Sequence, residues 1–384
     1  MKKVLFLNYE YPPLGGGAAN ATLFILREYA KLDDLDVDLV TSSVDEKYHL
    51  EEISGNVRVH RLPIGKNESN LHFQSQKDLL VYTWKAYFFS KKLIKEKEYD
   101  LTHSFFTVPC GAVSWLLWMQ YKIPYAISLR GSDVPGYSDR FGFIYKTLSF
   151  FIKHIWNKAE VVVSNSQGLK ELAHKTDPEQ EISVIYNGVD TEKFKPEFSK
   201  RDQDKILITM GGTRITHRKG IKHLIEAIDL LKDKYPDVVM EVMGEGNAKK
   251  ELEDQVDELG LNDRVKFWGV TSKKEMPTCY QRADIFVLAS FNEGMSNAML
   301  EALAAGLPIV STRTGGAEEL LGDGENGYFI EKKNSKDLAE KLEKIISDKE
   351  LRLQMGQKSR EKALEMSWEK VAQKYDELYG QLVR

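Results

Sequence analysis

Cysteine is scarce in this sequence. Only Cys110 and Cys279 are present among the 384 residues, and they lie in segments that the strand pattern below assigns to different domains. Disulfide-stabilised proteins and structural zinc sites need several cysteines at characteristic spacings. We therefore exclude a disulfide framework and a zinc site, and we expect a protein of the reducing cytoplasm.

Long apolar runs are absent as well. The longest candidate, around Trp115 to Met119, falls far short of the roughly 20 residues that span a bilayer. The apolar run Val4–Leu7 follows two lysines as in a signal peptide, but Asn8 ends it too early. We expect this run to form the first strand, and any membrane contact to be peripheral, at the inner membrane face.

Neither sign of charge dominates. The 54 basic and 58 acidic residues give a formal net charge of −4, which argues against a protein that coats nucleic acid. Asp36-Val37-Asp38 matches a metal-binding Asp-x-Asp pattern, but it lies at the amino end of a predicted strand, away from the ligand edge, where solvated charges are the simpler interpretation. Nothing else supplies a cluster of hard oxygen ligands, so we expect neither a metal nor a cofactor.

The sequence does contain a regular alternation of short apolar runs with amphipathic segments, which is typical of βα repeats. The predicted strands of the first half are Val4–Leu7, Val37–Val40, Val57–Leu62, Leu101–Phe105, Tyr125–Leu129, Val161–Ser164 and Ile182–Ile185. After a charged connector from about Thr191 to Asp204, the predicted strands are Ile206–Met210, Val238–Met243, Val265–Trp268, Ile285–Leu288, Ile309–Ser311 and Tyr328–Ile330. The length also exceeds what one hydrophobic core supports. We predict an α/β protein of two Rossmann-like, doubly wound domains, residues 1–190 and 191–366, facing across a cleft.

The stretch from Phe291 to Pro308 predicts a loop followed by a short helix. Ser296 or Asn297 is a suitable N-cap, Ala298 to Ala305 favour helix, and Gly306 suits its end. The helix start should offer free backbone N–H groups to a phosphate or a sugar hydroxyl, so we expect Gly294, Met295, Ser296 and Asn297 to contact a ligand that carries such groups.

Two glutamates of this stretch, Glu293 and Glu301, are eight residues apart. Glu293 lies in the loop at the carboxyl end of a predicted strand, where ligands of doubly wound sheets collect. Two helical turns fit the distance between the sugar and the ribose of a nucleotide sugar, so each carboxylate could accept hydrogen bonds from one end of it. Two solvated glutamates are the alternative.

Gly15-Gly16-Gly17 follows the first strand and precedes a helix expected near Asn20. Glycines allow close backbone approach to a phosphate. A dinucleotide fingerprint would need a further glycine, so an NAD site is poorly supported, and a flexible turn is the structural alternative.

A second glycine-containing loop, Gly211 to Gly220, leaves the first strand of the second domain. Gly211 and Gly212 can admit a ligand, Arg214 can bind two phosphate oxygens, and Lys219 adds a point charge. A leaving nucleoside diphosphate gains negative charge in the transition state, and without a metal these cations would stabilise it. A basic surface loop is the alternative.

His103 also ends a predicted strand, and it could hydrogen-bond an acceptor or a donor sugar as readily as fill a structural role. The aromatic, helix-periodic segments Phe73 to Lys97 and Phe141 to Lys158 are most simply core. Lys153, His154 and Lys158 on the other face of the second segment also permit contact with a membrane surface.

The whole pattern resembles the family 4 retaining glycosyltransferases of GT-B fold. The motifs that carry the resemblance extend over nearly the full length of the chain. They are Glu293-x7-Glu301, Asn187-Gly188-Val189-Asp190 with Phe194, the Gly211–Gly220 loop, Gly315-Gly316-x-x-Glu319 and Gly15-Gly16-Gly17. The resemblance implies that Glu293 contacts the donor sugar and Glu301 its ribose, that Gly16 and Gly17 touch the donor phosphate or the acceptor, and that a final helix from about 367 to 384 packs back on the first domain.

One position departs from the family pattern. The family frequently has His-Gly-x-Asp where this chain has Arg130-Gly131-Ser132-Asp133. A histidine-dependent role is therefore unavailable there, and we expect Arg130 and Asp133 to form an ion pair that shapes the acceptor pocket.

The resemblance implies a metal-independent, retaining transfer of a hexosyl unit from a nucleotide diphosphate sugar to a sugar, lipid-linked or small-molecule acceptor. Glu293, Arg214, Lys219 and His103 are the predicted catalytic residues. A nucleotide-sugar epimerase or phosphorylase of the same fold, and a catalytically silent sugar-binding module, are the alternatives.

Overall fold

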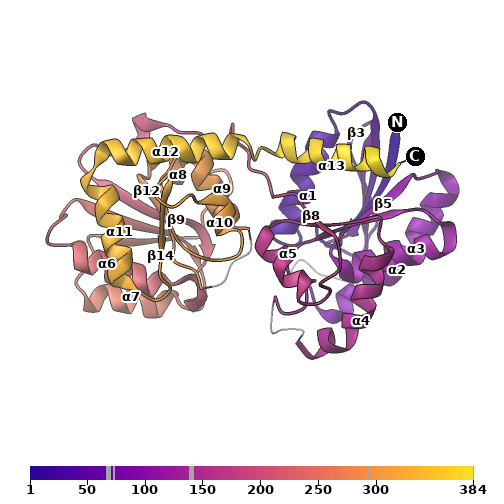
Figure 1. Ribbon diagram of the computed structural model, residues 1–384, viewed down its shortest axis with the longest axis horizontal. Helices are drawn as coiled ribbons and strands as arrows, with labels where there is room; N and C mark the ends of the chain where they lie inside the picture. Colours follow the sequence, from indigo (N-terminus) through magenta and orange to yellow (C-terminus); the bar gives the residue numbers. More distant parts are fainter. Residues whose placement is uncertain (66–70, 72–73, 138–141, 292–294, 384) are drawn as a thin grey trace. The chain divides into compact units, whose positions relative to one another are not determined.

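The computed structural model describes residues 1–65, 71, 74–137, 142–291 and 295–383. The chain divides into two compact units (Figure 1). Unit 1 comprises Met1–Asn187 together with Trp368–Arg384, and unit 2 comprises Gly188–Ser367. Each unit has its own sheet.

Unit 1 is built on an eight-stranded sheet with the order β3-β4-β2-β1-β5-β6-β7-β8. Its strands are β1 (Lys2–Leu7), β2 (Leu35–Ser42), β3 (His49–Ser54), β4 (Val57–Leu62), β5 (Leu101–Phe105), β6 (Tyr125–Leu129), β7 (Val161–Ser164) and β8 (Ile182–Val184). The strands run parallel, except that β3 pairs antiparallel with β4 at the edge. The carboxyl ends of the parallel strands therefore share one edge of the sheet.

The helices of unit 1 cover this sheet (Figure 1). They are α1 (Gly17–Tyr29), α2 (Gln76–Glu96), α3 (Ala112–Tyr121), α4 (Gly142–Lys158), α5 (Gln167–His174) and α13 (Trp368–Leu382). The chain's last helix, α13, packs on the first: Trp368 stacks on Phe24 of α1 at 5.3 Å between ring centroids. Tyr29 of α1 donates a hydrogen bond to the Tyr379 hydroxyl at 3.0 Å.

Unit 2 has a six-stranded parallel sheet with the order β11-β10-β9-β12-β13-β14. Its strands are β9 (Ile206–Arg214), β10 (Val238–Glu245), β11 (Val265–Gly269), β12 (Ile285–Leu288), β13 (Ile309–Thr312) and β14 (Gly327–Ile330). Its helices are α6 (Ile221–Leu231), α7 (Lys249–Glu258), α8 (Met276–Arg282), α9 (Asn297–Ala304), α10 (Ala317–Leu320), α11 (Ser335–Ser347) and α12 (Lys349–Leu364). The strand order reverses between β9 and β12, so the loops after these two strands lie at a switch point, where doubly wound sheets bind ligands.

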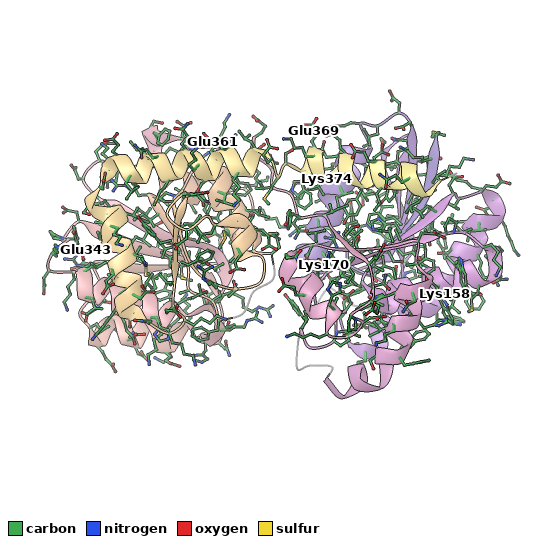
Figure 2. The ribbon with its side chains drawn as sticks, viewed as in Figure 1. Lys158, Lys170, Glu343, Glu361, Glu369 and Lys374 are labelled. Carbon is green, nitrogen blue, oxygen red and sulfur yellow. The ribbon has the colours of Figure 1, made fainter. Side chains whose placement is uncertain are left out.

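The cores follow from the apolar strands. Val4 and Phe6 of β1 are fully buried in unit 1, and Ile208 of β9 and Val287 of β12 are fully buried in unit 2. Charged side chains such as Glu361 of α12 and Lys374 of α13 point away from the ribbon (Figure 2). The α/β, doubly wound prediction is confirmed for both sheets.

One detail of unit 1 differs from expectation. Strand β3 was not predicted, because its exposed sequence His49–Ser54 lacks a buried face and pairs only at the sheet edge.

The apolar side chains Ile152, Ile155 and Trp156 of α4 are fully buried, as expected of core. Among the described residues, no helix is long and apolar enough to cross a membrane.

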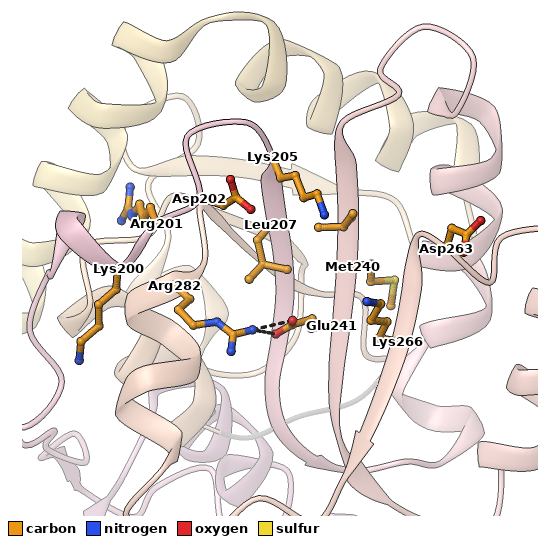
Figure 3. A pocket seen from close by; sticks show the side chains of 11 residues that line it. Lys200, Arg201, Asp202, Lys205, Leu207, Met240, Glu241, Asp263, Lys266 and Arg282 are labelled. Atoms are coloured by element: carbon orange, nitrogen blue, oxygen red, sulfur yellow. Dashed lines mark hydrogen bonds and ion pairs between the residues drawn. The ribbon is translucent and has the colours of Figure 1, made fainter.

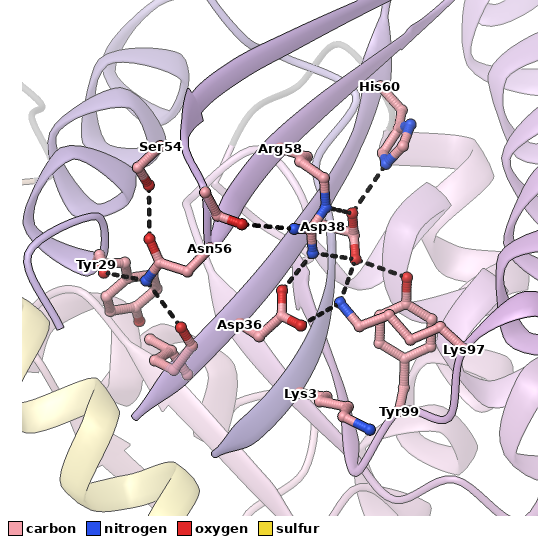
Figure 4. Close-up of polar contacts among 12 residues, drawn as sticks. Lys3, Tyr29, Asp36, Asp38, Ser54, Asn56, Arg58, His60, Lys97 and Tyr99 are labelled. Atoms are coloured by element: carbon pink, nitrogen blue, oxygen red, sulfur yellow. Dashed lines mark hydrogen bonds and ion pairs between the residues drawn. The ribbon is translucent and has the colours of Figure 1, made fainter. Parts of the chain in front are cut away.

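The Asp36-Val37-Asp38 segment of β2 lies at the amino end of its strand as predicted, but its carboxylates are not solvated (Figure 4). Asp38 is only 3% exposed and accepts hydrogen bonds from Arg58 at 2.6 Å, Lys97 at 2.8 Å and Tyr99 at 2.8 Å. Burial raises the pKa of Asp38, but these bonds and one from His60 outweigh it and hold the pKa far below its usual range. The network is an internal ion cluster, which corrects the solvated interpretation.

Candidate functional site

Helix α9 forms as its sequence predicts. Ser296 is the N-cap, and its hydroxyl accepts a hydrogen bond from the Met299 N–H at 3.3 Å. Gly306 follows the helix with φ +70°, a conformation that glycine adopts without strain. Glu293 and Gly294, two of the residues predicted to meet the donor, lie outside the described residues.

Glu301 sits in the second turn of α9 and is half-buried. Burial raises the pKa of this carboxyl to about 7, while the nearby Tyr280 hydroxyl and the more distant charges of Lys193 and Lys273 act in the opposite direction. A carboxylate in such surroundings has further lone pairs to offer to hydroxyl donors. Glu301 is therefore equipped to bind a polyol.

Tyr280 of α8 explains why position 211 in the second half of β9 is a glycine. A Cβ added to Gly211 would lie 2.2 Å from the Tyr280 hydroxyl oxygen, and one added to Gly212 would lie 3.0 Å from Met276 Sδ. Gly211 thus admits the fully buried Tyr280 rather than a ligand, while Gly212 is exposed. Tyr280 was missed from the sequence, because an aromatic residue in a short helix looks like ordinary core.

The loops after β9 and β12 are joined directly. The Phe291 N–H donates to the Arg218 carbonyl at 2.8 Å. A Cβ on Gly220 would lie 2.1 Å from the Ala289 carbonyl oxygen, so only glycine permits this contact. The structure therefore brings the Arg214–Lys219 segment beside the residues that immediately precede Glu293.

The two predicted phosphate-binding cations frame this loop. Arg214 is the last residue of β9 and is exposed, whereas Lys219 is half-buried at the end of a 3₁₀ turn formed by His217–Lys219. Both lie at the carboxyl end of β9, the edge at which ligands of parallel sheets bind. They can supply positive charge to a polyanion on unit 2.

The early glycine loop of unit 1 begins α1 at Gly17, three residues before the predicted start. Gly16 is the N-cap, and its N–H donates to Oε2 of Glu10 at 3.4 Å. A Cβ on Gly15 would clash with the Glu10 side chain at 2.5 Å, whereas one on Gly16 would meet no atom within 4 Å. The space over Gly16 is therefore open, whereas the carboxylate of Glu10 already occupies the space beside Gly15.

His103 of β5 is only 1% exposed. Its Nδ1 shares a 2.6 Å hydrogen bond with the Tyr379 hydroxyl, and its Nε2 shares a 2.8 Å hydrogen bond with the Ser128 hydroxyl. Burial, together with the positive charge of Arg130, holds the pKa of His103 well below its ordinary value, so the ring is neutral. With both ring nitrogens engaged inside unit 1, the structure favours the structural alternative for His103.

Arg130 and Asp133 do not form the expected ion pair. The Arg130 guanidinium donates to Asn187 at 2.9 Å and to the Tyr375 hydroxyl at 3.1 Å, and it stacks on Phe105 at 3.4 Å from the ring centroid. Asp133 instead accepts backbone N–H groups of Arg130 at 2.9 Å and Thr107 at 2.8 Å. The two side chains are held by separate partners because Asp133 organises its own loop, and the ion-pair prediction is wrong.

A charged hollow also lies at the other end of the unit 2 strands (Figure 3). This cavity of about 410 Å³ is lined by Lys205, Lys266 and Asp263, among others, and Arg282 contacts both oxygens of Glu241 at 2.6 and 2.8 Å within it. It borders the amino-terminal halves of β9 and β10, whereas Arg214 ends β9. The hollow is therefore separate from the predicted donor site.

In the part of the chain that the structure describes, no group of three or more His, Cys, Asp or Glu side chains is arranged to hold a metal ion. The described charges around the β9 and β12 loops include those of Arg214, Arg218, Lys219 and Glu301. This arrangement can bind a ligand that carries phosphate at one end and hydroxyl groups at the other.

Two family models match the chain. Glycosyltransferase Family 4 matches residues 15–193, and Glycosyl transferases group 1 matches residues 190–362. The chain is 28% identical to an uncharacterized glycosyltransferase of Methanocaldococcus jannaschii, over 99% of this chain and 98% of that protein.

Solved structures share the fold. Sucrose-phosphate synthase from Thermosynechococcus elongatus superposes with a TM-score of 0.83 at 21% identity, covering 100% of this chain and 99% of that one. HepE from Anabaena, solved in complex with UDP-glucose, gives a TM-score of 0.74 at 21% identity, covering 99% of this chain and 100% of that one. The two family models adjoin and together span residues 15–362, so the chain belongs to the group 1, family 4 glycosyltransferases and is a transferase of GT-B fold.

Proposed function

We propose that this enzyme transfers a hexosyl unit from a nucleotide diphosphate sugar to an acceptor hydroxyl, with retention of configuration and without a metal ion. The acceptor is a glycan, a glycolipid or a small molecule. The scarcity of cysteine supports a cytoplasmic location.

The observation that carries this proposal is the environment of Glu301. Its carboxyl is shielded from water enough to raise the pKa to about 7, although the nearby Tyr280 hydroxyl acts to lower it. Two ribose hydroxyls would complete its hydrogen bonds and stabilise the ionised form. HepE, of the same fold, binds UDP-glucose, which supports a nucleotide sugar as the ligand.

In this proposal Arg214 and Lys219 bind the diphosphate. As the bond between the anomeric carbon and the phosphate oxygen breaks, negative charge builds on the leaving diphosphate, and these cations stabilise it more strongly than in the ground state. The leaving phosphate oxygen takes the proton of the acceptor hydroxyl, which attacks from the same face. Glu293 contacts the transferred sugar, by resemblance to the family.

The donor is tested by a thermal-shift panel of nucleotide sugars on the full chain. A true donor at about 100 times its Kd should stabilise the protein by roughly 2.7 kcal/mol. A flat panel contradicts the donor assignment.

Metal independence is tested with EDTA, which should leave turnover intact because Arg214 and Lys219 supply the positive charge. Loss of activity that Mn²⁺ restores would contradict it. Release of free nucleotide only in the presence of acceptor separates a transferase from an epimerase, and NMR of the anomeric proton reports retention or inversion.

A further inference from the structure

Helix α2 carries apolar side chains on two opposite faces. Tyr82 and Ala86 are fully buried against the sheet of unit 1. Leu80, Trp84 and Phe88 face outward instead and are 72%, 65% and 52% exposed. Because these three residues are four positions apart, they form one stripe about 12 Å long on the outer surface of α2. We call these three side chains the α2 stripe.

Two of the three side chains in the α2 stripe contact each other, so the stripe is not a scatter of single exposed residues. The rings of Trp84 and Phe88 contact each other edge to face, with centroids 5.4 Å apart. On the neighbouring helix α3, Gln120 accepts a 2.8 Å hydrogen bond from Tyr87 of α2, and the adjacent Met119 is 42% exposed. Contiguous apolar surface of this kind marks an interaction site more often than an idle surface.

Lysines lie at both ends of the stripe. Lys77 precedes Leu80 by three residues, and Lys91 and Lys92 follow Phe88 by three and four residues, so all three share its side of the helix. The α2 segment holds five lysines and two acidic residues, a formal charge of +3, whereas the whole chain carries −4. Lys91 also lies over the rings of Tyr87 at 5.2 Å and Phe88 at 5.9 Å.

We propose that the α2 stripe docks the protein on an anionic lipid bilayer. A tryptophan and a phenylalanine between lysines is the pattern of a helix lying in the membrane interface, where the rings enter the acyl boundary and the ammonium groups meet the lipid phosphates. A second copy of this chain fits less well. Antiparallel pairing of two stripes would set Lys77 of one copy against Lys91 and Lys92 of the other, and like charges repel.

This docking surface differs from the one that the sequence suggested. On α4, Ile152, Ile155 and Trp156 beside Lys153 and Lys158 are core, and Phe150 is exposed by itself, so that helix has no comparable apolar stripe among its described side chains. Membrane docking through the α2 stripe is a property separate from the proposed transfer reaction, and it does not depend on the donor or the mechanism of that reaction.

Co-sedimentation of the full chain with large unilamellar vesicles tests the proposal. The protein should bind vesicles that contain phosphatidylglycerol and should not bind vesicles of phosphatidylcholine alone. The Leu80→Ser/Trp84→Ser/Phe88→Ser variant should lose at least ten-fold in partitioning. Lys77→Gln should lose about five-fold, because one lysine near an anionic surface contributes about that factor.

A matched control is Leu230→Ser/Leu353→Ser, which removes side chains 54% and 44% exposed on α6 and α12 of unit 2 and should bind vesicles like the unaltered chain. The thermal shift with nucleotide sugars should be the same for all variants, so a failure of the donor assignment leaves the vesicle result interpretable. Equal binding by the stripe variant and the unaltered chain overturns the proposal. So does a dimer in light scattering that the stripe variant abolishes without any vesicle binding.

Discussion

Two shielded carboxylates, one in each unit, have opposite pKa shifts. Asp38 of β2 exposes the smaller fraction of its surface, yet its pKa lies far below the usual range because Arg58, Lys97, Tyr99 and His60 all bond to it. Glu301 of α9 has the Tyr280 hydroxyl as a polar neighbour, and burial raises its pKa to about 7. Burial alone therefore does not distinguish a structural carboxylate from one that binds a ligand. The number of hydrogen-bonding partners distinguishes them, and Glu301, which has few, can still accept hydrogen bonds from a ligand.

The largest effect should follow from Asp38→Asn. Removing the charge leaves Arg58 and Lys97 facing fewer counter-charges, and breaking a buried ionic cluster costs about 3–5 kcal/mol of unfolding free energy. Because the folded pKa is depressed, the stabilisation by Asp38 is present above the unfolded pKa of about 3.9 and fades as pH falls below it. Urea denaturation across pH 3 to 7 measures both effects.

The exposed Asp33→Asn serves as the control for Asp38 and should change stability little. Equal losses of unfolding free energy in the two variants would mean that the ion cluster stabilises the fold no more than an exposed aspartate does. Donor binding should persist in both variants once they are folded.

Arg214→Ala and Lys219→Ala should come next in size. Removing one group that stabilises developing charge typically costs about 10²–10³ in kcat. The loss should fall on kcat more than on KM, because the diphosphate gains charge only as the bond breaks. Steady-state kinetics measure this, and the exposed Lys222→Ala on α6 is the control. A change confined to KM would assign both cations to ground-state binding.

Glu301→Gln should weaken binding of the nucleoside diphosphate by about 1.5–3 kcal/mol, the range for hydrogen bonds to a charged group. Ribose hydroxyls stabilise the carboxylate, so binding by the unaltered chain should lower the pKa from about 7 and release protons near neutral pH. Calorimetry in two buffers of different ionisation enthalpy measures that release.

The variant Glu340→Gln, on an exposed position of α11, controls for the loss of one charge. Proton release that persists in Glu301→Gln would show that a different group titrates. In that case the contrast between Asp38 and Glu301 would not extend to ligand binding.

The smallest effect should come from His103→Gln. Its folded pKa is depressed, so the unfolded chain binds a proton below pH 6.5 and the folded chain does not, and stability should fall by about 1.4 kcal/mol per pH unit as the pH drops. His103→Gln should remove this slope and leave kcat within about three-fold, because the ring acts through Tyr379 and Ser128. The exposed His49→Gln should keep the slope. A large loss of kcat in His103→Gln would return this residue to the catalytic set.

The sequence predicted most of the fold because buried parallel strands are continuous apolar runs. β5, β6 and β12 have the predicted bounds, and α9 begins at its predicted cap. Strand β3 was not predicted, because an exposed edge strand has no continuous apolar run in its sequence. Helix α1 began three residues early because glycine is tolerated at a helix start.

The side-chain partners could not be predicted in the same way. Asp38 meets Arg58 and Lys97, which lie 20 and 59 residues away in sequence. His103 meets Tyr379, which lies 276 residues away. Spacing along one element indicates which residues share a face, but contacts between distant elements depend on packing that no local pattern records. The roles of Glu293, Arg214 and Lys219 stay predictions.

Helix α13 sets the time at which unit 1 can be completed during synthesis. The chain leaves unit 1 after Asn187 and returns only at Trp368. At about 5–20 residues per second, the ribosome needs roughly 10–40 s to make the intervening segment. Throughout that interval Phe24, Tyr29 and His103 lack the aromatic partners that α13 later supplies. Unit 1 is started first and finished last, so its incomplete core is what a chaperone would meet on the nascent chain.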